Sequence, residues 1–320
     1  MAQAQVDPTV AREGSDVATQ GDSRSKVYSA AEAIRTFVGE GMTVGMGGQN
    51  INRCPMALVH EVIRQGIGEL SIVGCNLSLP VDLLVASGLV RHTEQGSGNL
   101  ERYGVLYSWR RALESGTLTT HDHSHLAMAS RFLAGAMGIP FLPTRSLVGS
   151  TIATDLVRSG LAIQADDPFG GGQVLLLRAQ APDVALIHVS RVDEIGNVAI
   201  DGVSSHEVDM VRASRTAVVS AEQVLPAGAF YDEPERVTIS GAHVTAVVEQ
   251  RYGAFPTSVY RHYDFSEPDI KEYQAVAKSG GDSLTDWLQS NVLSQADFDS
   301  YLADRSPDIR GLERQMRSLQ

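Results

Sequence analysis

The chain has 320 residues, of which 43% are hydrophobic, and it carries a formal net charge of −12. This size and composition allow one large α/β domain or two modest ones around a substantial core. Its only lysines are Lys26, Lys271 and Lys278, and it has neither a basic run nor an apolar stretch of about 20 residues, which argues against nucleic-acid binding and against a membrane span.

The first 25 residues and the two cysteines bear on the compartment. Residues 1–25 are rich in Gln, Asp, Ser and Thr, which predicts a disordered segment, and they lack the apolar stretch of a secretory signal. Cys54 and Cys75 form no paired motif and are too few to staple a chain of this length. These features predict a reduced, cytoplasmic protein.

From residue 29 onward, helical and strand patterns alternate. Helices are expected where apolar residues recur every three or four positions, and strands where short apolar runs end at glycine. In chain order, the sequence predicts a helix over 29–40, a strand over 43–46, a helix over 55–65, a strand over 70–73, a helix over 79–87 and a strand over 90–93. A polar connection over 94–108, a helical turn over 110–115 and a helix over 125–137 follow.

The second half of the chain begins with an irregular stretch over 140–183, which contains a glycine-rich turn over 166–172. Val184–Val189 is a continuous apolar run, typical of a central parallel strand. Further strands are expected over 198–200, 217–220 and 244–248, together with a helix over 205–213 and an amphipathic helical tail over 272–306. The alternation predicts an α/β protein with a mainly parallel sheet.

The segment that joins the first strand to the second helix is rich in glycine. Gly45, Gly47 and Gly48 precede a polar loop over 49–53, and Pro55 opens the helix. Bare backbone N–H groups therefore lie at the carboxyl end of a strand, where open α/β sheets bind anionic ligands. The loop lacks the third glycine of a dinucleotide fingerprint and the Gly-Lys pair of a P-loop. A plain tight turn is the alternative interpretation.

Several side chains near predicted strand ends are candidates for chemistry. Arg53 lies in the glycine loop itself, where a guanidinium suits a carboxylate or phosphate ligand. Of Glu94, Glu101 and Glu114, Glu101 is the best placed to act as a base or acyl acceptor; the alternative is an exposed or arginine-paired acid. Cys54 stands at a helix start, but without an evident histidine partner it is expected to pack as a small apolar side chain.

Three histidines, His121, His123 and His125, occupy alternate positions. On a strand they would share one face and could hold a metal ion. The segment directly precedes the helix over 125–137, however, and Asp122 or Ser124 is a natural N-cap there. Solvated histidines around a helix start are therefore expected, and no metal site is predicted.

The loop Gly47–Pro55 resembles the Gly-Gly…Pro signature of family I CoA-transferases, and the chain as a whole resembles their A (alpha) subunits of the glutaconate CoA-transferase type. Further matching blocks follow in order over about residues 26–305. They are Leu83–Gly88, Arg110–Gly116, Ala134–Pro143, Asp167–Phe169, Pro182–His188, Asp193–Val198 and Val247–Ser258. Each block is short, and their shared order and spacing carry the resemblance.

The resemblance implies a three-layer α/β/α fold over residues 26–270, followed by a helical C-terminal extension over 271–320. It also implies a partner B (beta) subunit of similar fold, in a heterotetramer or larger assembly with the active site at the interface. In this family a glutamate attacks the acyl-CoA thioester; the acyl-glutamyl anhydride then becomes a glutamyl-CoA thioester, which passes CoA to a second acid. In glutaconate-type enzymes that glutamate belongs to the B subunit. No catalytic nucleophile is therefore expected here, and no permanently bound cofactor, since the CoA thioester is a substrate.

On this interpretation the chain supplies part of the substrate pocket. The candidate substrate-binding residues are Gly47, Gly48, Gln49, Asn50, Asn52, Arg53 and Ser97. The backbone N–H groups of residues 47–50 are expected to stabilise a developing oxyanion, and Arg53 or Ser97 to hold the free carboxylate of a dicarboxylic acid. Gln49 stands where the wider family commonly has an aromatic residue, and residues 93–99 differ from the glutaconate pattern, so the identity of the acid stays open.

Two alternatives use the same scaffold. One is a hydrolase of CoA esters or cyclic ketones, in which Glu101 would activate water. The other is a non-catalytic ligand-binding protein, as in sugar-phosphate-responsive repressors; it would need a DNA-binding module, and the chain has no basic helix-turn-helix segment.

Overall fold

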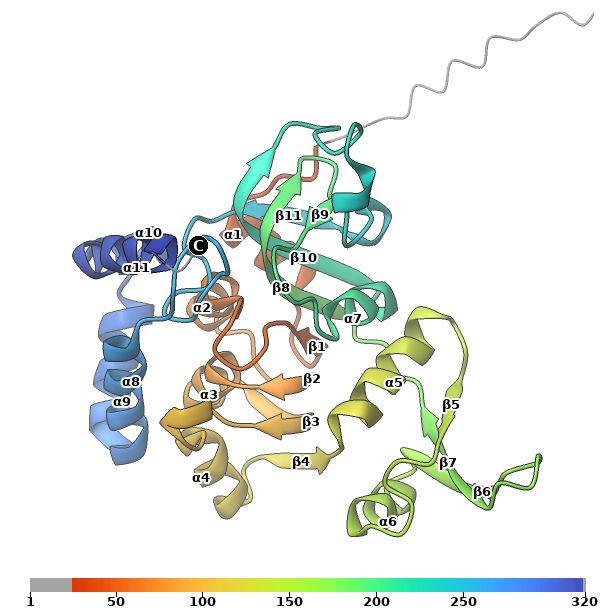
Figure 1. Cartoon of the computed structure of the whole chain (residues 1–320). Coiled ribbons are helices and arrows are strands. Elements are labelled where there is room, and N and C mark those ends of the chain that lie inside the picture. Colours follow the sequence, from red (N-terminus) through yellow and green to blue (C-terminus); the bar gives the residue numbers. More distant parts are fainter. Residues whose placement is uncertain (1–24, 319–320) are drawn as a thin grey trace, which may run out of the picture.

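The computed structural model describes residues 25–318, so the predicted disordered segment lies outside the described residues apart from Ser25. Its main sheet has seven parallel strands in the order β11-β10-β8-β1-β2-β3-β4, and β9 pairs antiparallel with β8 (Figure 1). The strands are β1 (Thr43–Met46), β2 (Leu70–Leu77), β3 (Val90–Gly98), β4 (Thr119–Asp122), β8 (Val184–Asp193), β9 (Val198–Ala199), β10 (Thr216–Leu225) and β11 (Ala246–Glu249). The predicted, mainly parallel sheet is confirmed.

Helices cover both faces of this sheet, as two core clusters show. One face carries α1 (Ala30–Phe37), α2 (Met56–Arg64), α3 (Leu79–Ala86) and α4 (Tyr107–Ser115), and the other carries α5 (His125–Ala136) and α7 (Glu207–Ala213). Along β8, Leu186 joins the first cluster and Ile187 the second, because successive strand residues point to opposite faces. The result is the three-layer α/β/α arrangement that the family resemblance implies.

Several strands are longer than predicted. The strand predicted over 70–73 continues through Gly74 to Leu77, and a Cβ at Gly74 would lie 3.1 Å from the Met46 carbonyl oxygen. Glycine therefore allows close strand packing here and does not end the strand. β3 likewise runs to Gly98, so the polar connection predicted to start at residue 94 starts later. This correction moves Glu94 and Ser97 from a loop into the sheet.

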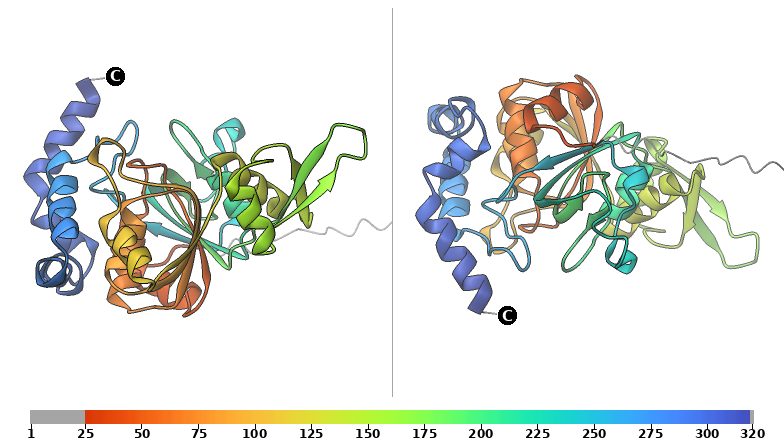
Figure 2. Two further views of the ribbon diagram at one scale, coloured as in Figure 1. Left: turned by 90° about the horizontal axis from the view of Figure 1, so that it is seen from below. Right: turned by 90° about the horizontal axis from the view of Figure 1, so that it is seen from above.

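The stretch over 140–183 is not irregular, contrary to the prediction. It forms β5 (Phe141–Thr144), α6 (Thr151–Arg158), β6 (Ala162–Asp166) and β7 (Gln173–Arg178), whose strands pair antiparallel in the order β5-β7-β6. This arm projects from the main sheet beyond α5 (Figures 1 and 2). Leu175 and Leu177 are fully buried against α6, but the apolar Leu176 between them hides this alternation in the sequence. The turn over 166–172 is confirmed as the β6–β7 connection.

The helical tail is confirmed, and it packs beside the first helix layer (Figure 2). It consists of α8 (Glu267–Ser279), α9 (Gly281–Leu288), a π-helical turn (Gln289–Leu293), α10 (Phe298–Ala303) and α11 (Ser306–Ser318). The predicted boundary at residue 271 falls inside α8. Short 3₁₀ turns cover Glu101–Tyr103, Pro234–Arg236 and Gly241–His243. No helix between residues 25 and 318 combines the length and apolar character that a bilayer crossing requires.

Candidate active site

A pocket of about 610 Å³ opens where the loops after β1, β3, β9 and β11 meet. Its lining comprises Gln49, Asn50, Ile51, Asn52, Arg53, Glu101, Asp201, Gly202, Val203, Ser258, Tyr260, Asp264 and Phe265. The parallel strands β1, β3 and β11 deliver their following loops to one edge of the sheet, and the segment after the antiparallel β9 runs back along β8 to reach them. The pocket thus brings together Gln49, Asn50, Asn52, Arg53 and Glu101 from the predicted site residues.

Hydrogen bonds clamp the glycine turn at nearly every position. The N–H of Gly47 donates to Leu186 O (2.9 Å) and that of Gly48 to Glu207 Oε1 (2.9 Å). The Gln49 N–H donates to Asn52 O (2.8 Å) and the Asn52 N–H to Gln49 O (3.0 Å). Within residues 25–318, the backbone N–H groups of Asn50 and Ile51 are the main-chain donors of the 47–53 turn without an internal partner. The oxyanion donors predicted over 47–50 are therefore largely engaged by the protein itself.

Left-handed backbone is concentrated at this pocket. Seven described residues other than glycine have positive φ, and three of them line the pocket: Asn50 (54°), Arg53 (53°) and Glu101 (55°). Such conformations cost free energy and persist where the surrounding structure fixes them, commonly at functional sites. Their clustering supports the assignment of this pocket as the functional one.

Close contacts leave no room for a side chain at the two glycines that begin the turn, Gly47 and Gly48. A Cβ at Gly47 would lie 2.7 Å from Ile187 Cγ2 and 3.0 Å from Leu186 O. A Cβ at Gly48 would lie 3.0 Å from Cys54 Cα, and Gly48 also has a φ of +92°. Neither glycine lines the pocket: Gly47 holds the turn against the first half of β8, and Gly48 holds it against Cys54, just before α2.

Arg53 contributes to the pocket lining, but its guanidinium is buried and paired within the protein. Its side chain is 2% exposed, and Nη2 lies 2.7 Å from Glu207 Oε2 and donates to Val203 O (2.7 Å). Nη1 has no partner among the described residues. The guanidinium charge is thus already compensated by Glu207. The sequence does not predict this residue, because no local pattern marks a glutamate at a helix start as the partner of a turn 159 residues earlier.

Cys54 packs inside the same turn, as predicted. It is fully buried, and burial raises the pKa of its thiol to about 11. Its Sγ donates to Asn50 O (3.2 Å) and lies 3.4 Å from Ser78 Oγ, which itself hydrogen-bonds Asn50 O. A protonated thiol held this way fixes the carbonyl side of the turn and is not a nucleophile.

The other predicted side chains divide between the pocket and the sheet. Glu101 lies at the pocket wall, where its Oε1 accepts a hydrogen bond from Asn50 Nδ2. Ser97 is not brought into the pocket: its Oγ donates to Asn76 Oδ1 (2.8 Å) and lies 2.9 Å from His125 Nε2. Glu114 forms an exposed ion pair with Arg110 (2.9 Å), which confirms its interpretation as an arginine-paired acid.

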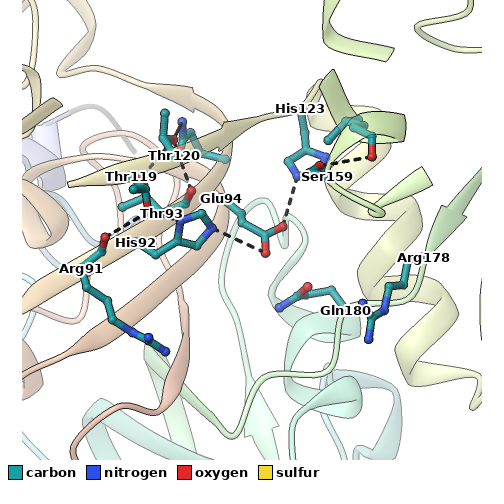
Figure 3. A network of polar contacts seen from close by, with 12 residues as sticks. Arg91, His92, Thr93, Glu94, Thr119, Thr120, His123, Ser159, Arg178 and Gln180 are labelled. Carbon is teal, nitrogen blue, oxygen red and sulfur yellow. Dashed lines mark hydrogen bonds and ion pairs between the residues drawn. The ribbon is translucent and has the colours of Figure 1, made fainter. Parts of the chain in front are cut away.

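A buried polar network lies on β3, away from the pocket. Glu94 Oε2 pairs with Arg131 of α5 and lies 3.2 Å from His123 Nε2. Arg131 also donates to Gln180 Oε1 (2.7 Å). Figure 3 shows Glu94 between His92 and His123. Burial alone would raise the pKa of Glu94, but the bond to His123 and the charge of Arg131 outweigh it and lower the pKa to about 2. The network joins the main sheet to the arm.

The three predicted histidines do not converge. His123 binds Glu94, His125 binds Ser97, and the His121 ring packs edge-on against His92 at 4.9 Å between centroids. Ser124 is the N-cap of α5, since its side chain accepts the Ala127 N–H (3.1 Å). No cluster of three or more His, Cys, Asp or Glu side chains in the described part of the chain is suited to a metal ion.

Comparisons with known proteins agree with this architecture. The family model described as coenzyme A transferase matches residues 27–250. The A chain of the Acidaminococcus fermentans glutaconate CoA-transferase is 30% identical over 292 residues, which cover 87% of this chain and 91% of that protein. The solved glutaconate CoA-transferase from the same organism aligns with a TM-score of 0.83 at 30% identity, covering 88% of this chain and 92% of that chain.

Two further relatives extend the comparison. A protein of Archaeoglobus fulgidus is 35% identical over 279 residues, or 87% of this chain, but this chain spans only 61% of that protein's length. The cholesterol ring-cleaving hydrolase IpdA subunit of Rhodococcus jostii is 26% identical over 265 residues, which cover 81% of this chain and 88% of that protein. The family model spans most of the chain, and the fold agrees with that of the solved glutaconate CoA-transferase. The chain therefore belongs to the coenzyme A transferase family and is similar along most of its length to a glutaconate-type A subunit.

Proposed function

We propose that this chain is the alpha subunit of a two-component CoA-transferase, which moves CoA between an acyl-CoA and a free acid. The observation that carries the proposal is a pocket that offers free backbone N–H donors, while the carboxylates that line it already have hydrogen-bond or ion-pair partners in this chain. Glu101 accepts from Asn50, Asp201 pairs with Arg191 (2.8 Å), and Asp264 accepts the Phe265 N–H (2.8 Å). A covalent mechanism then takes its nucleophilic glutamate from a partner B subunit.

In this proposal the partner's glutamate attacks the thioester carbonyl, and the acyl oxygen gains negative charge. The N–H groups of Asn50 and Ile51 are the donors available to that oxygen, because the rest of the turn is internally bonded. Loss of the CoA thiolate gives the acyl-glutamyl anhydride. The thiolate then attacks the glutamyl carbonyl of this anhydride, which frees the first acid and leaves a glutamyl-CoA thioester. The second acid then repeats these steps in reverse order.

The side chains around the donors give the pocket its remaining properties. Gln49 and Asn52 line it beside the turn and are proposed to contact the acid, while Gly47 and Gly48 hold the turn's shape. Arg53 and Ser97 stay predictions as holders of a second carboxylate. No permanent cofactor is proposed, since coenzyme A enters as a thioester substrate. Two free, buried cysteines fit the cytoplasmic location that we propose, because thiols persist in a reducing compartment.

The test is co-expression with the product of the adjacent gene, followed by incubation with an acyl-CoA and a candidate acid. Hydroxylamine or borohydride should then convert a glutamyl thioester into a hydroxamate or an alcohol, and mass spectrometry should find that modification on a glutamate of the partner. The purified complex should migrate as a heterotetramer or larger. A modification on this chain, or transfer without any partner, would contradict the proposed division of roles between the two chains.

Hydrolysis on the same scaffold is the second candidate. Glu101 lies in the pocket, its carboxylate can act on water, and one relative is a subunit of a ring-cleaving hydrolase. The two candidates differ in one assay: a hydrolase releases free CoA, or opens a ring, when no acceptor acid is present, whereas a transferase requires the acid.

A further inference from the structure

Glu207 is a carboxylate that lies behind the pocket and contacts two parts of the glycine turn. It is the first residue of α7, and its side chain is fully buried. Oε1 accepts the Gly48 N–H at 2.9 Å, and Oε2 lies 2.7 Å from Arg53 Nη2. One carboxylate thus connects the backbone at the start of the turn to the side chain at its end.

Stability alone does not account for this pair. Removing two charges from water costs several kcal/mol per ion, and well-packed apolar replacements of buried ion pairs are commonly neutral or stabilising. The pair also leaves Arg53 Nη1 buried without a partner in the described structure, which is a further cost. What the contacts do provide is orientation. The Glu207 carboxylate accepts the Gly48 N–H while it also contacts Arg53, and so it holds the Gly48 peptide in place at a φ of +92°.

We propose that Glu207 is a positioning residue for CoA transfer: it holds the Gly48 peptide so that the Asn50 and Ile51 N–H groups keep the direction in which they meet the acyl oxygen. The inference rests on the function proposed above. Gly48 is followed directly by the Gln49–Asn52 turn, so rotation of its peptide plane shifts both donors. A displacement of about 1 Å at a reacting group is enough to cost about 100-fold in rate.

The test compares Glu207→Gln with Glu207→Met in the complex with the partner subunit. Both variants remove the charge that faces Arg53, but only glutamine keeps an oxygen that can accept the Gly48 N–H. We expect kcat to fall about 10- to 100-fold further in E207M than in E207Q, with KM for acyl-CoA changed less than about threefold. A role in binding alone would instead raise KM equally in both.

Folding is kept separate from positioning by repeating the comparison in an Arg53→Met background, where no uncompensated charge stays buried. The ratio of kcat between R53M/E207Q and R53M/E207M should persist although the melting temperatures converge. Glu61→Gln and Glu61→Met are the matched controls, because Glu61 is also a mostly buried acid paired with an arginine, Arg64 (2.6 Å), but lies on α2 outside the pocket. Their kcat values should agree.

Amide hydrogen exchange tests the same idea without turnover. The N–H groups of Gly48 and Gln49, which are hydrogen-bonded in the wild type, should exchange faster in E207M than in E207Q, and the Glu61 pair should show no such difference. A complex that transfers CoA to no acid would contradict the proposed function, while the exchange comparison would still report on Glu207. Equal exchange at Gly48 and Gln49, or equal kcat of E207Q and E207M in a complex that does transfer CoA, would overturn the positioning role.

Discussion

Gly48 shows how one missing side chain shapes the pocket. Its φ of +92° disfavours any L side chain, and a Cβ there would press on Cys54 Cα at 3.0 Å and on Sγ at 3.1 Å. Cys54 in turn holds the Asn50 carbonyl, so pressure at Gly48 is transmitted to the donors at the tip of the turn.

We therefore expect Gly48→Val to abolish turnover, with a loss of at least about 100-fold in kcat, and to leave the complex with the partner assembled. The backbone strain should lower the free energy of unfolding by about 1–3 kcal/mol. Gly88→Ala is the control, because Gly88 also has positive φ (72°) but its Cβ would meet nothing within 4 Å. It should lose stability without losing kcat. Unchanged turnover in Gly48→Val, measured beside gel filtration of the complex, would refute the role of the turn.

Glu94 gives a prediction about pH. Its pKa lies at about 2 in the folded chain, below the usual glutamate value of 4.5. A depressed carboxyl pKa stabilises the folded state above the unfolded pKa, and this contribution is lost as the pH falls towards the folded value. Between pH 6 and pH 3 the wild type should lose about 2 kcal/mol more unfolding free energy than Glu94→Gln.

Urea unfolding at several pH values measures this difference. At neutral pH, Glu94→Gln should itself cost about 3–5 kcal/mol, because it leaves the buried Arg131 charge uncompensated. Glu114→Gln is the comparison, since its ion pair with Arg110 is mostly exposed. If the free energy of unfolding depends on pH in the same way in the wild type and in Glu94→Gln, Glu94 makes no pH-dependent contribution to stability.

At the scale of elements, local patterns predict what local contacts stabilise. β1 matches its predicted range of 43–46 because an apolar run with glycines is followed directly by a loop. β3 extends beyond its predicted range because Glu94 and Gln95 are polar yet buried, and their partners Arg131 and Asp122 lie 37 and 27 residues further on. For the same reason the sequence predicts the turn over 49–53 as a site but not its buried support at Glu207.

The tail helix α10 provides the prediction at this scale. Phe298 is 1% exposed, and its ring packs on His60 of α2 at 5.0 Å between centroids. Phe298→Ala should lower the free energy of unfolding by about 3–5 kcal/mol through the cavity it leaves. Leu293→Ala, at a side chain that is 46% exposed, should change it by about 0.5 kcal/mol or less. Equal effects in urea unfolding would mean that the tail contributes little to the core.

At the scale of the whole molecule, the pocket exists because four loops share one edge of the sheet. The loops after β1, β3, β9 and β11 each supply part of the lining, and none of them encloses the pocket alone. Periodicity in the sequence predicts the α/β layers, and its glycines predict the first loop. Asp201, Tyr260 and Phe265 are not predictable in this way, since only the strand order places them beside the turn.

The same strand order has a consequence for how the chain folds during synthesis. β1 lies between β2 and β8 in the sheet, and Val44 pairs with both Ile72 and Val184. The first four strands and the whole arm therefore leave the ribosome before β8 can cover the open side of β1. Until then a half-sheet exposes an unpaired apolar edge, which is the kind of surface that favours aggregation and chaperone binding. Pairing across so long a separation also slows folding, which prolongs the time for which that edge is exposed.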